Sequence, residues 1–90
     1  MKEEYVETVL ALIAYMENHL TEPSLLTLDS LSAICGYSPY HLLRLFRDAV
    51  GLTPAEYTRK RRLTEVIRYI SEHDSTFEAA AQLYGFRSKE

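Results

Sequence analysis

The side chains whose types and spacing most clearly suggest ligand binding lie in the segment 39–50. Four of them occupy positions i, i+3, i+4 and i+7, which share one face of a helix: Tyr40, Leu43, Arg44 and Arg47. A guanidinium can pair with guanine O6 and N7 through two parallel hydrogen bonds, so Arg44 is the strongest candidate for reading a base. Tyr40 can offer its hydroxyl or ring to a base edge, Leu43 only apolar contact to a thymine methyl, and Arg47 is placed for a phosphate. The alternatives are ordinary surface arginines and a Tyr40 that packs on the preceding helix.

The surroundings of these residues are basic although the whole chain is acidic. The net charge is −3. Residues 1–36 sum to −5, residues 37–70 to +4 and residues 71–90 to −2. Because salt screens charges beyond about 8–10 Å, the local sum decides the field at a surface. The middle third can therefore attract phosphate, although a solvated, salt-bridged helix surface would show the same charge pattern.

Glycine, proline and hydroxyl side chains divide the chain into five predicted helices. These helices are expected over residues 2–20, 28–35, 39–50, 54–71 and 75–84, with a loop over 21–24. The expected N-caps are Thr27, Ser38, Thr53 and Ser75, and the expected C-terminal stops are Gly36, Gly51 and Gly85. Glu56 and Glu78 complete capping-box patterns with the last two N-caps. No alternating apolar–polar stretch predicts a strand, so the predicted fold class is all-α.

Apolar spacing assigns a buried face to three of these helices. In the first helix the face consists of Val6, Val9, Leu10, Ile13 and Leu20. In the third it consists of Leu42, Leu45, Phe46 and Ala49. In the fourth it consists of Tyr57, Leu63, Val66, Ile67 and Ile70.

The helices 28–35 and 39–50 form the pattern of a helix-turn-helix. Only Gly36-Tyr37-Ser38 separates them, and a short turn containing glycine is typical of this motif. In a DNA-binding helix-turn-helix the second helix enters the major groove, and its exposed face contacts the bases. The expected fold is therefore homeodomain-like, with 39–50 as the recognition helix and Ser38 at its start as a phosphate ligand.

The run Arg59-Lys60-Arg61-Arg62 supplies further cations on the fourth helix. Four consecutive helical residues sweep about 400°, so they cannot all face one surface. Some of them must flank the core with their stems, and one or two are expected to contact phosphate. Arg59, Lys60 and Arg61 are the candidates.

Taken together, the motifs resemble the DNA-binding domain of the AraC/XylS family of bacterial transcription regulators. The segment 31–42 is similar to the first helix-turn-helix of that family, and Arg44-Leu45-Phe46-Arg47, Gly51-Leu52-Thr53-Pro54, Tyr57 and Arg62-Leu63 follow at the family's spacing. The segment 79–88 is similar to the opening of its second helix-turn-helix. The resemblance implies that Tyr40, Leu43, Arg44 and Arg47 face DNA. Some relatives carry a polar amide at the position of Leu43, so base specificity there does not transfer.

The resemblance also implies a domain organisation and partners. Residues 1–90 are expected to be a single domain, with a first helix-turn-helix over 1–51, a linker helix over 54–71 and the start of a second helix-turn-helix over 75–90. The second recognition helix would begin near Ser88, so the second unit is expected to be truncated. Double-stranded DNA is the implied partner. The chain resembles members in which a GyrI-like effector-binding domain follows the DNA-binding domain, so a C-terminal effector-binding domain outside these 90 residues is expected as a partner. RNA polymerase is left open as a partner.

Nothing in the sequence favours catalysis. His19, His41 and His73 are scattered without a nearby nucleophile, and no cofactor or metal motif is present. The single cysteine excludes an internal disulfide, and no signal peptide or membrane span is apparent, so a cytoplasmic protein is expected. The alternative function is a protein–protein interaction module that docks a partner through the acidic first helix or an apolar tail.

Overall fold

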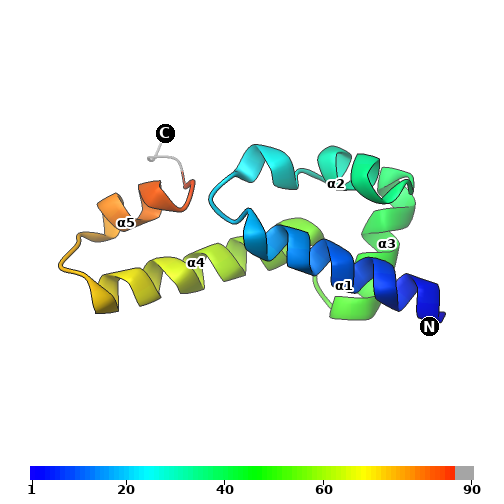
Figure 1. Ribbon diagram of the computed structural model, residues 1–90, viewed down its shortest axis with the longest axis horizontal. Coiled ribbons are helices and arrows are strands. Elements are labelled where there is room, and N and C mark those ends of the chain that lie inside the picture. Colours follow the sequence, from blue (N-terminus) through cyan, green and yellow to red (C-terminus); the bar gives the residue numbers. More distant parts are fainter. Residues whose placement is uncertain (87–90) are drawn as a thin grey trace.

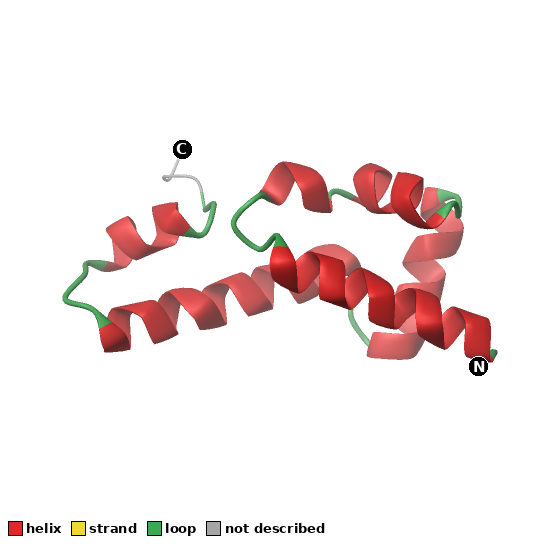
Figure 2. Ribbon diagram, in the orientation of Figure 1, coloured by secondary structure: helices red, strands yellow, loops and turns green. Residues whose placement is uncertain are grey.

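The computed structural model describes residues 1–86, and this part of the chain is all-helical, as predicted (Figures 1 and 2). Its elements are α1 (Glu3–Asn18), the short 3-10 helix η1 (Pro23–Leu26), α2 (Leu28–Cys35), α3 (Pro39–Val50), α4 (Pro54–Glu72) and α5 (Phe77–Leu83). The first three α-helices form a bundle at one end of the long α4, and α5 lies against its other end (Figure 1). The molecule is accordingly elongated, measuring 45 × 25 × 18 Å. No helix among these residues is both long and apolar enough to cross a membrane.

The starts of α2, α3 and α4 confirm the predicted caps. The Thr27 hydroxyl accepts a hydrogen bond from the Ser30 backbone N–H at 3.1 Å, and Ser38 begins α3 in the same way. Thr53 forms the complete capping box, in which the Glu56 carboxylate accepts from the Thr53 backbone N–H at 2.9 Å. These bonds satisfy N–H groups that the first helical turn leaves without partners.

The start of α5 and the segment after α1 differ from the prediction. Thr76, not Ser75, caps α5 by accepting from the Ala79 backbone N–H at 3.1 Å. Either hydroxyl of the Ser–Thr pair can cap, and the shift by one residue moves Glu78 out of the position that closes a capping box. The expected loop over 21–24 runs into η1, whose first residue is Pro23.

The main core lies where α1, η1, α2 and α3 meet. Its buried residues are Val9, Leu12, Met16, Leu26, Leu31, Leu42, Leu45 and Phe46. The predicted face of α1 was partly wrong, because Leu12 and Met16 are buried whereas Val6 and Leu10 are exposed. Apolar residues surround almost the whole of α1, so their spacing alone does not locate the side that meets α2 and α3. Ala49 is also exposed, contrary to the prediction that it belongs to the buried face of α3.

The second half of α4 packs against α5. Val66 and Ala80 are buried between them. The Tyr69 and Tyr84 rings meet edge to face at a centroid distance of 6.4 Å. Leu63 and Ile67 are exposed, contrary to the prediction that the whole apolar side of α4 is buried. The reason is that α4 extends beyond the first bundle, and the contacts of α5 leave these two residues uncovered within the described part of the chain.

The end of α5 returns to the loop that follows α1. The Arg62 guanidinium donates to the Leu20 carbonyl at 2.8 Å and lies over the Phe86 ring at 5.6 Å. Gly85 has a φ of +87°, and a Cβ there would lie 2.7 Å from the Pro23 side chain. Glycine is therefore required at this position both by the backbone conformation and by the close approach.

Gly85→Ala is expected to destabilise the protein more than Gly51→Ala. Both glycines have positive φ, which costs a residue with a Cβ about 1–2 kcal/mol, but a Cβ on Gly51 would meet no atom within 4 Å. Urea unfolding of the two variants isolates the additional cost of displacing Pro23. Equal destabilisation would show that the end of α5 does not contact this loop.

Candidate nucleic-acid interface

The turn between α2 and α3 is fixed by one buried hydroxyl. Gly36 ends α2 in the left-handed conformation with a φ of 82°. The buried Ser32 donates its hydroxyl hydrogen to the Tyr37 carbonyl and so ties α2 to the turn. Sequence reasoning missed this contact, although a lone serine facing the apolar side of a short helix is a signal for such a bond. The turn therefore holds α3 at a defined angle to α2.

Packing of α3 decides which of its side chains face outward. Leu42 and Phe46 are fully buried, so the opposite face of the helix must be exposed. Tyr40, with 69% of its surface accessible, lies there together with Arg44 and Arg47. Leu43 is half-buried at the border of this face. Three of the four predicted side chains are therefore presented to solvent, and the fourth only in part.

Tyr40 and Arg44 contact each other across one turn of α3. An Arg44 Nη1 hydrogen points to the Tyr40 hydroxyl at 3.4 Å, and the guanidinium carbon lies 5.8 Å from the ring centre. This hydrogen bond is the main cause that raises the pKa of Arg44. A guanidinium has five N–H donors, so the contact orients Arg44 and leaves most of its donors for another ligand.

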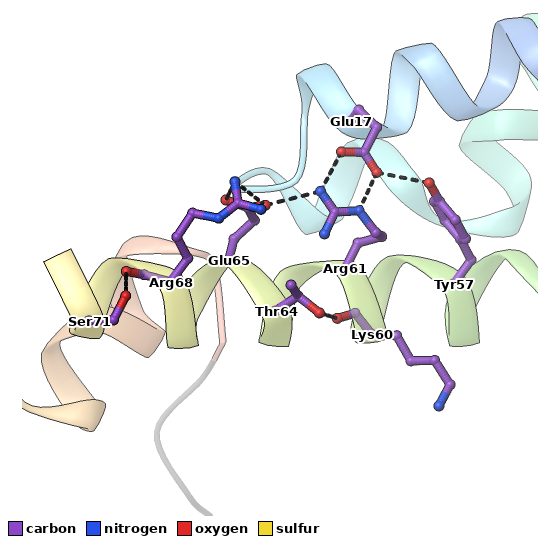
Figure 3. Close-up of polar contacts among 8 residues, drawn as sticks. All are labelled: Glu17, Tyr57, Lys60, Arg61, Thr64, Glu65, Arg68 and Ser71. Carbon is purple, nitrogen blue, oxygen red and sulfur yellow. Dashed lines mark hydrogen bonds and ion pairs between the residues drawn. The ribbon is translucent and has the colours of Figure 1, made fainter.

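The basic run on α4 divides between structural and exposed roles (Figure 3). Arg61 makes a two-bonded ion pair with Glu17 of α1, from Nε to Oε2 at 2.7 Å and from Nη2 to Oε1 at 2.8 Å. It also contacts Glu65 at 3.0 Å, and the Tyr57 hydroxyl donates to Glu17 at 2.8 Å. The hydrogen bond with Glu17 is the main cause that raises the pKa of Arg61. Arg61 therefore joins α1 to α4.

Arg59 and Lys60 are the exposed members of the run 59–62. Arg61 is half-buried against α1, and Arg62 is half-buried where α4 meets α5. Figure 3 shows Lys60 extending from the side of α4 away from the Arg61–Glu17 pair. The exposed Glu56 carboxyl lies in the electric field of Lys60 and of Arg47 of α3. The backbone hydrogen bond from Thr53 is the first cause of its lowered pKa, and the positive charges of Arg47 and Lys60 contribute. Arg47 and Lys60 therefore lie near one carboxylate, and the basic surface continues from α3 onto α4.

A cavity of about 540 Å³ adjoins the outward face of α3. Met1, Lys2 and Tyr5 line one side, and Tyr40, Arg44 and Asp48 are among the residues that line the other. Sequence reasoning missed Asp48, although its position four residues after Arg44 places it on the same edge of the helix.

Comparison with known proteins decides the family. The family model for a helix-turn-helix domain matches residues 31–90, which include the whole candidate interface. The probable transcription factor PqrA of Proteus vulgaris is 36% identical over 89 residues, which are 99% of this chain and 70% of that protein. The multiple antibiotic resistance protein MarA of Escherichia coli K12 is 31% identical over 83 residues, which are 92% of this chain and 64% of that protein. The chain belongs to the AraC/XylS family.

The predicted resemblance to AraC/XylS regulators is thereby confirmed, and with it the helix-turn-helix DNA-binding class of the domain. The chain spans a little under two thirds of MarA. The right origin-binding protein of Escherichia coli K12 is 43% identical over 54 residues, which are 60% of this chain and 18% of that protein. No solved structure matches the chain significantly.

Proposed function

We propose that this AraC/XylS-family domain binds double-stranded DNA with sequence specificity by placing α3 in the major groove, and that it thereby regulates transcription. The observation that carries the proposal is the exposed face of Tyr40, Arg44 and Arg47, directly opposite the buried Leu42 and Phe46. Readout of the major groove needs a helix whose outer face is exposed and whose orientation is fixed. The turn between α2 and α3 provides that orientation. The names of two relatives, a transcription factor and an origin-binding protein, point the same way.

Within this proposal the exposed side chains take different roles. Arg44 pairs with a guanine, Tyr40 contacts the neighbouring base edge, and the half-buried Leu43 touches a thymine methyl with its accessible part. These contacts would read sequence.

Other groups hold the phosphates and set the position of α3. They are the Ser38 hydroxyl, Arg47, Arg59 and Lys60. Ser38 can still donate its hydroxyl hydrogen, because its capping bond uses the oxygen as an acceptor. Arg61 drops out of the phosphate set because Glu17 and Glu65 hold its guanidinium.

The proposed domain organisation is the one that the family resemblance implies. Helices α1 to α3 form the first helix-turn-helix unit, α4 is the linker helix, and α5 opens the second unit. DNA binding as proposed uses no catalytic step or cofactor, and with DNA as its partner the protein would act in the bacterial cytoplasm. An effector-binding domain and RNA polymerase stay predictions of the family resemblance.

Salt dependence tests this function, and Lys60→Ala is its most informative variant. The full chain is titrated against a labelled mixed-sequence duplex by fluorescence anisotropy at several salt concentrations. Affinity is expected to fall steeply with salt, and loss of one phosphate contact is expected to reduce the slope of log K against log salt by about 0.9. Arg68→Ala is the matched control, because Arg68 is an exposed cation of α4 that pairs with Glu65. Absence of binding at low salt would contradict the proposal and favour a protein–protein interaction module.

A further inference from the structure

An exposed carboxylate stands on the DNA-facing side of α3. Tyr40, Arg44 and Asp48 follow each other at four-residue steps, so they form a row along one edge of the helix. All three are exposed, and all three line the cavity that adjoins this face. Asp48 therefore occupies the position next to the proposed base-reading arginine, where an anion is least expected on a DNA-binding surface.

The carboxylate of Asp48 contributes to the raised pKa of Arg44 but is not held in a salt bridge in the described part of the chain. Among residues 1–86 no lysine or arginine forms an ion pair with it. Arg44 instead directs its guanidinium toward Tyr40, one turn earlier in α3. An acid that follows an arginine by four residues is also the weaker order for a helical ion pair. The acceptor oxygens of Asp48 are thus available to a ligand.

Close to DNA such a carboxylate has two effects. The phosphates repel it, so it weakens binding to every sequence that offers it no partner. A partner exists in the major groove where cytosine presents its N4 amino group, because a carboxylate can accept a hydrogen bond from that donor. A cytosine in reach of Asp48 therefore removes the penalty, and other bases leave it in place.

We propose that Asp48 is a specificity-determining residue, which selects a cytosine beside the base pair read by Arg44 and disfavours other sequences. The inference rests on the proposed function of α3 in the major groove. With this inference, specificity comes from two residues and not from one. Arg44 raises the affinity for sites with the matching guanine, and Asp48 lowers the affinity for sites that lack the cytosine.

The test compares Asp48→Asn with Asp74→Asn in the full chain. Both remove one exposed negative charge, but Asp74 lies in the connection between α4 and α5. On a mixed-sequence duplex at low salt Asp48→Asn is expected to bind about threefold tighter than the wild type, as expected for removing a charge about 7 Å from a phosphate in water. Asp74→Asn is expected to change affinity much less.

Selection from a randomised duplex pool supplies the second readout. The wild type is expected to enrich a cytosine beside a guanine, Asp48→Asn to keep the guanine and lose the cytosine, and Arg44→Ala to lose the guanine. Equal effects of the two aspartate variants on the mixed duplex, or identical selected sequences for wild type and Asp48→Asn, would overturn the role of Asp48 alone. A wild type that binds no duplex would overturn the proposed function and this inference with it.

Discussion

Arg44→Ala is expected to remove most of the sequence-specific DNA affinity of the chain and to leave its fold unchanged. Arg44 is exposed, and among residues 1–86 its side-chain hydrogen bond goes to Tyr40 on the same helix. The core side of α3 does not depend on it, because Leu42, Leu45 and Phe46 carry the packing there. Loss of binding in this variant would therefore report on the interface and not on folding.

The size of the effect follows from the chemistry of the contact. A bidentate arginine–guanine pair discriminates between bases by about ten- to one-hundredfold, so Arg44→Ala should lose about that factor on a selected duplex. Arg44→Lys keeps the charge but loses the planar pair of donors, so it should retain mixed-sequence binding and lose the preference for guanine. Anisotropy titrations on selected and mixed duplexes measure both quantities.

Two results would contradict this assignment. If Arg44→Ala weakened binding to selected and mixed duplexes equally, Arg44 would be a phosphate ligand and not a reader of bases. If Arg44→Ala left both affinities unchanged, the exposed face of α3 would not be the DNA-binding face. A thermal unfolding curve that matches the wild type is the control for both.

The fold was largely predictable from the sequence because helix starts are decided locally. Thr27, Ser38 and Thr53 each bond to a backbone N–H three residues ahead, so a short window of sequence contains the whole signal. The same holds for the left-handed glycine after α2, since Gly36 has a φ that other residues rarely adopt. The exposed face of α3 was equally predictable, because apolar residues lie on one side of this helix and basic residues on the other.

The roles within the basic run were not predictable, because they depend on partners that are remote in sequence. Arg61 meets Glu17 from 44 positions away, and Arg62 meets the Leu20 carbonyl from 42 positions away. Helical periodicity says only that four consecutive residues point in different directions. Which direction meets another helix depends on how α4 crosses α1, and this is set by packing of the whole bundle.

The Arg61 contact leads to the second large effect, a loss of stability in Glu17→Gln. The Glu17 carboxylate accepts two bonds from Arg61 and one from Tyr57, and both acid and arginine are less than one third exposed. A glutamine has one acceptor oxygen, and its NH₂ group would face the donors of Arg61. Loss of charge-assisted hydrogen bonds of this kind should reduce the free energy of unfolding by about 2 kcal/mol at pH 7.

Glu7→Gln is the matched control, because Glu7 lies exposed on the same helix. It should change stability little, as expected for a surface charge. Urea unfolding at pH 7 compares the three proteins. Equal stability of Glu17→Gln and Glu7→Gln would show that the Glu17–Arg61 contact does not hold α1 to α4.

The pH dependence of this difference separates the ion pair from simple packing. The hydrogen bond from Arg61 is the main cause that holds the pKa of Glu17 below its ordinary value of 4.5, assisted by Tyr57 and opposed by burial. A carboxyl whose pKa is lower in the folded state stabilises the protein fully above the unfolded pKa and loses this contribution as the pH falls through the folded one. The stability gap between wild type and Glu17→Gln should therefore be constant from pH 7 to about pH 5 and shrink below about pH 4.5. A gap that stayed constant into acid would mean that the glutamine disturbs packing, and that the charge of Glu17 contributes little to joining α1 and α4.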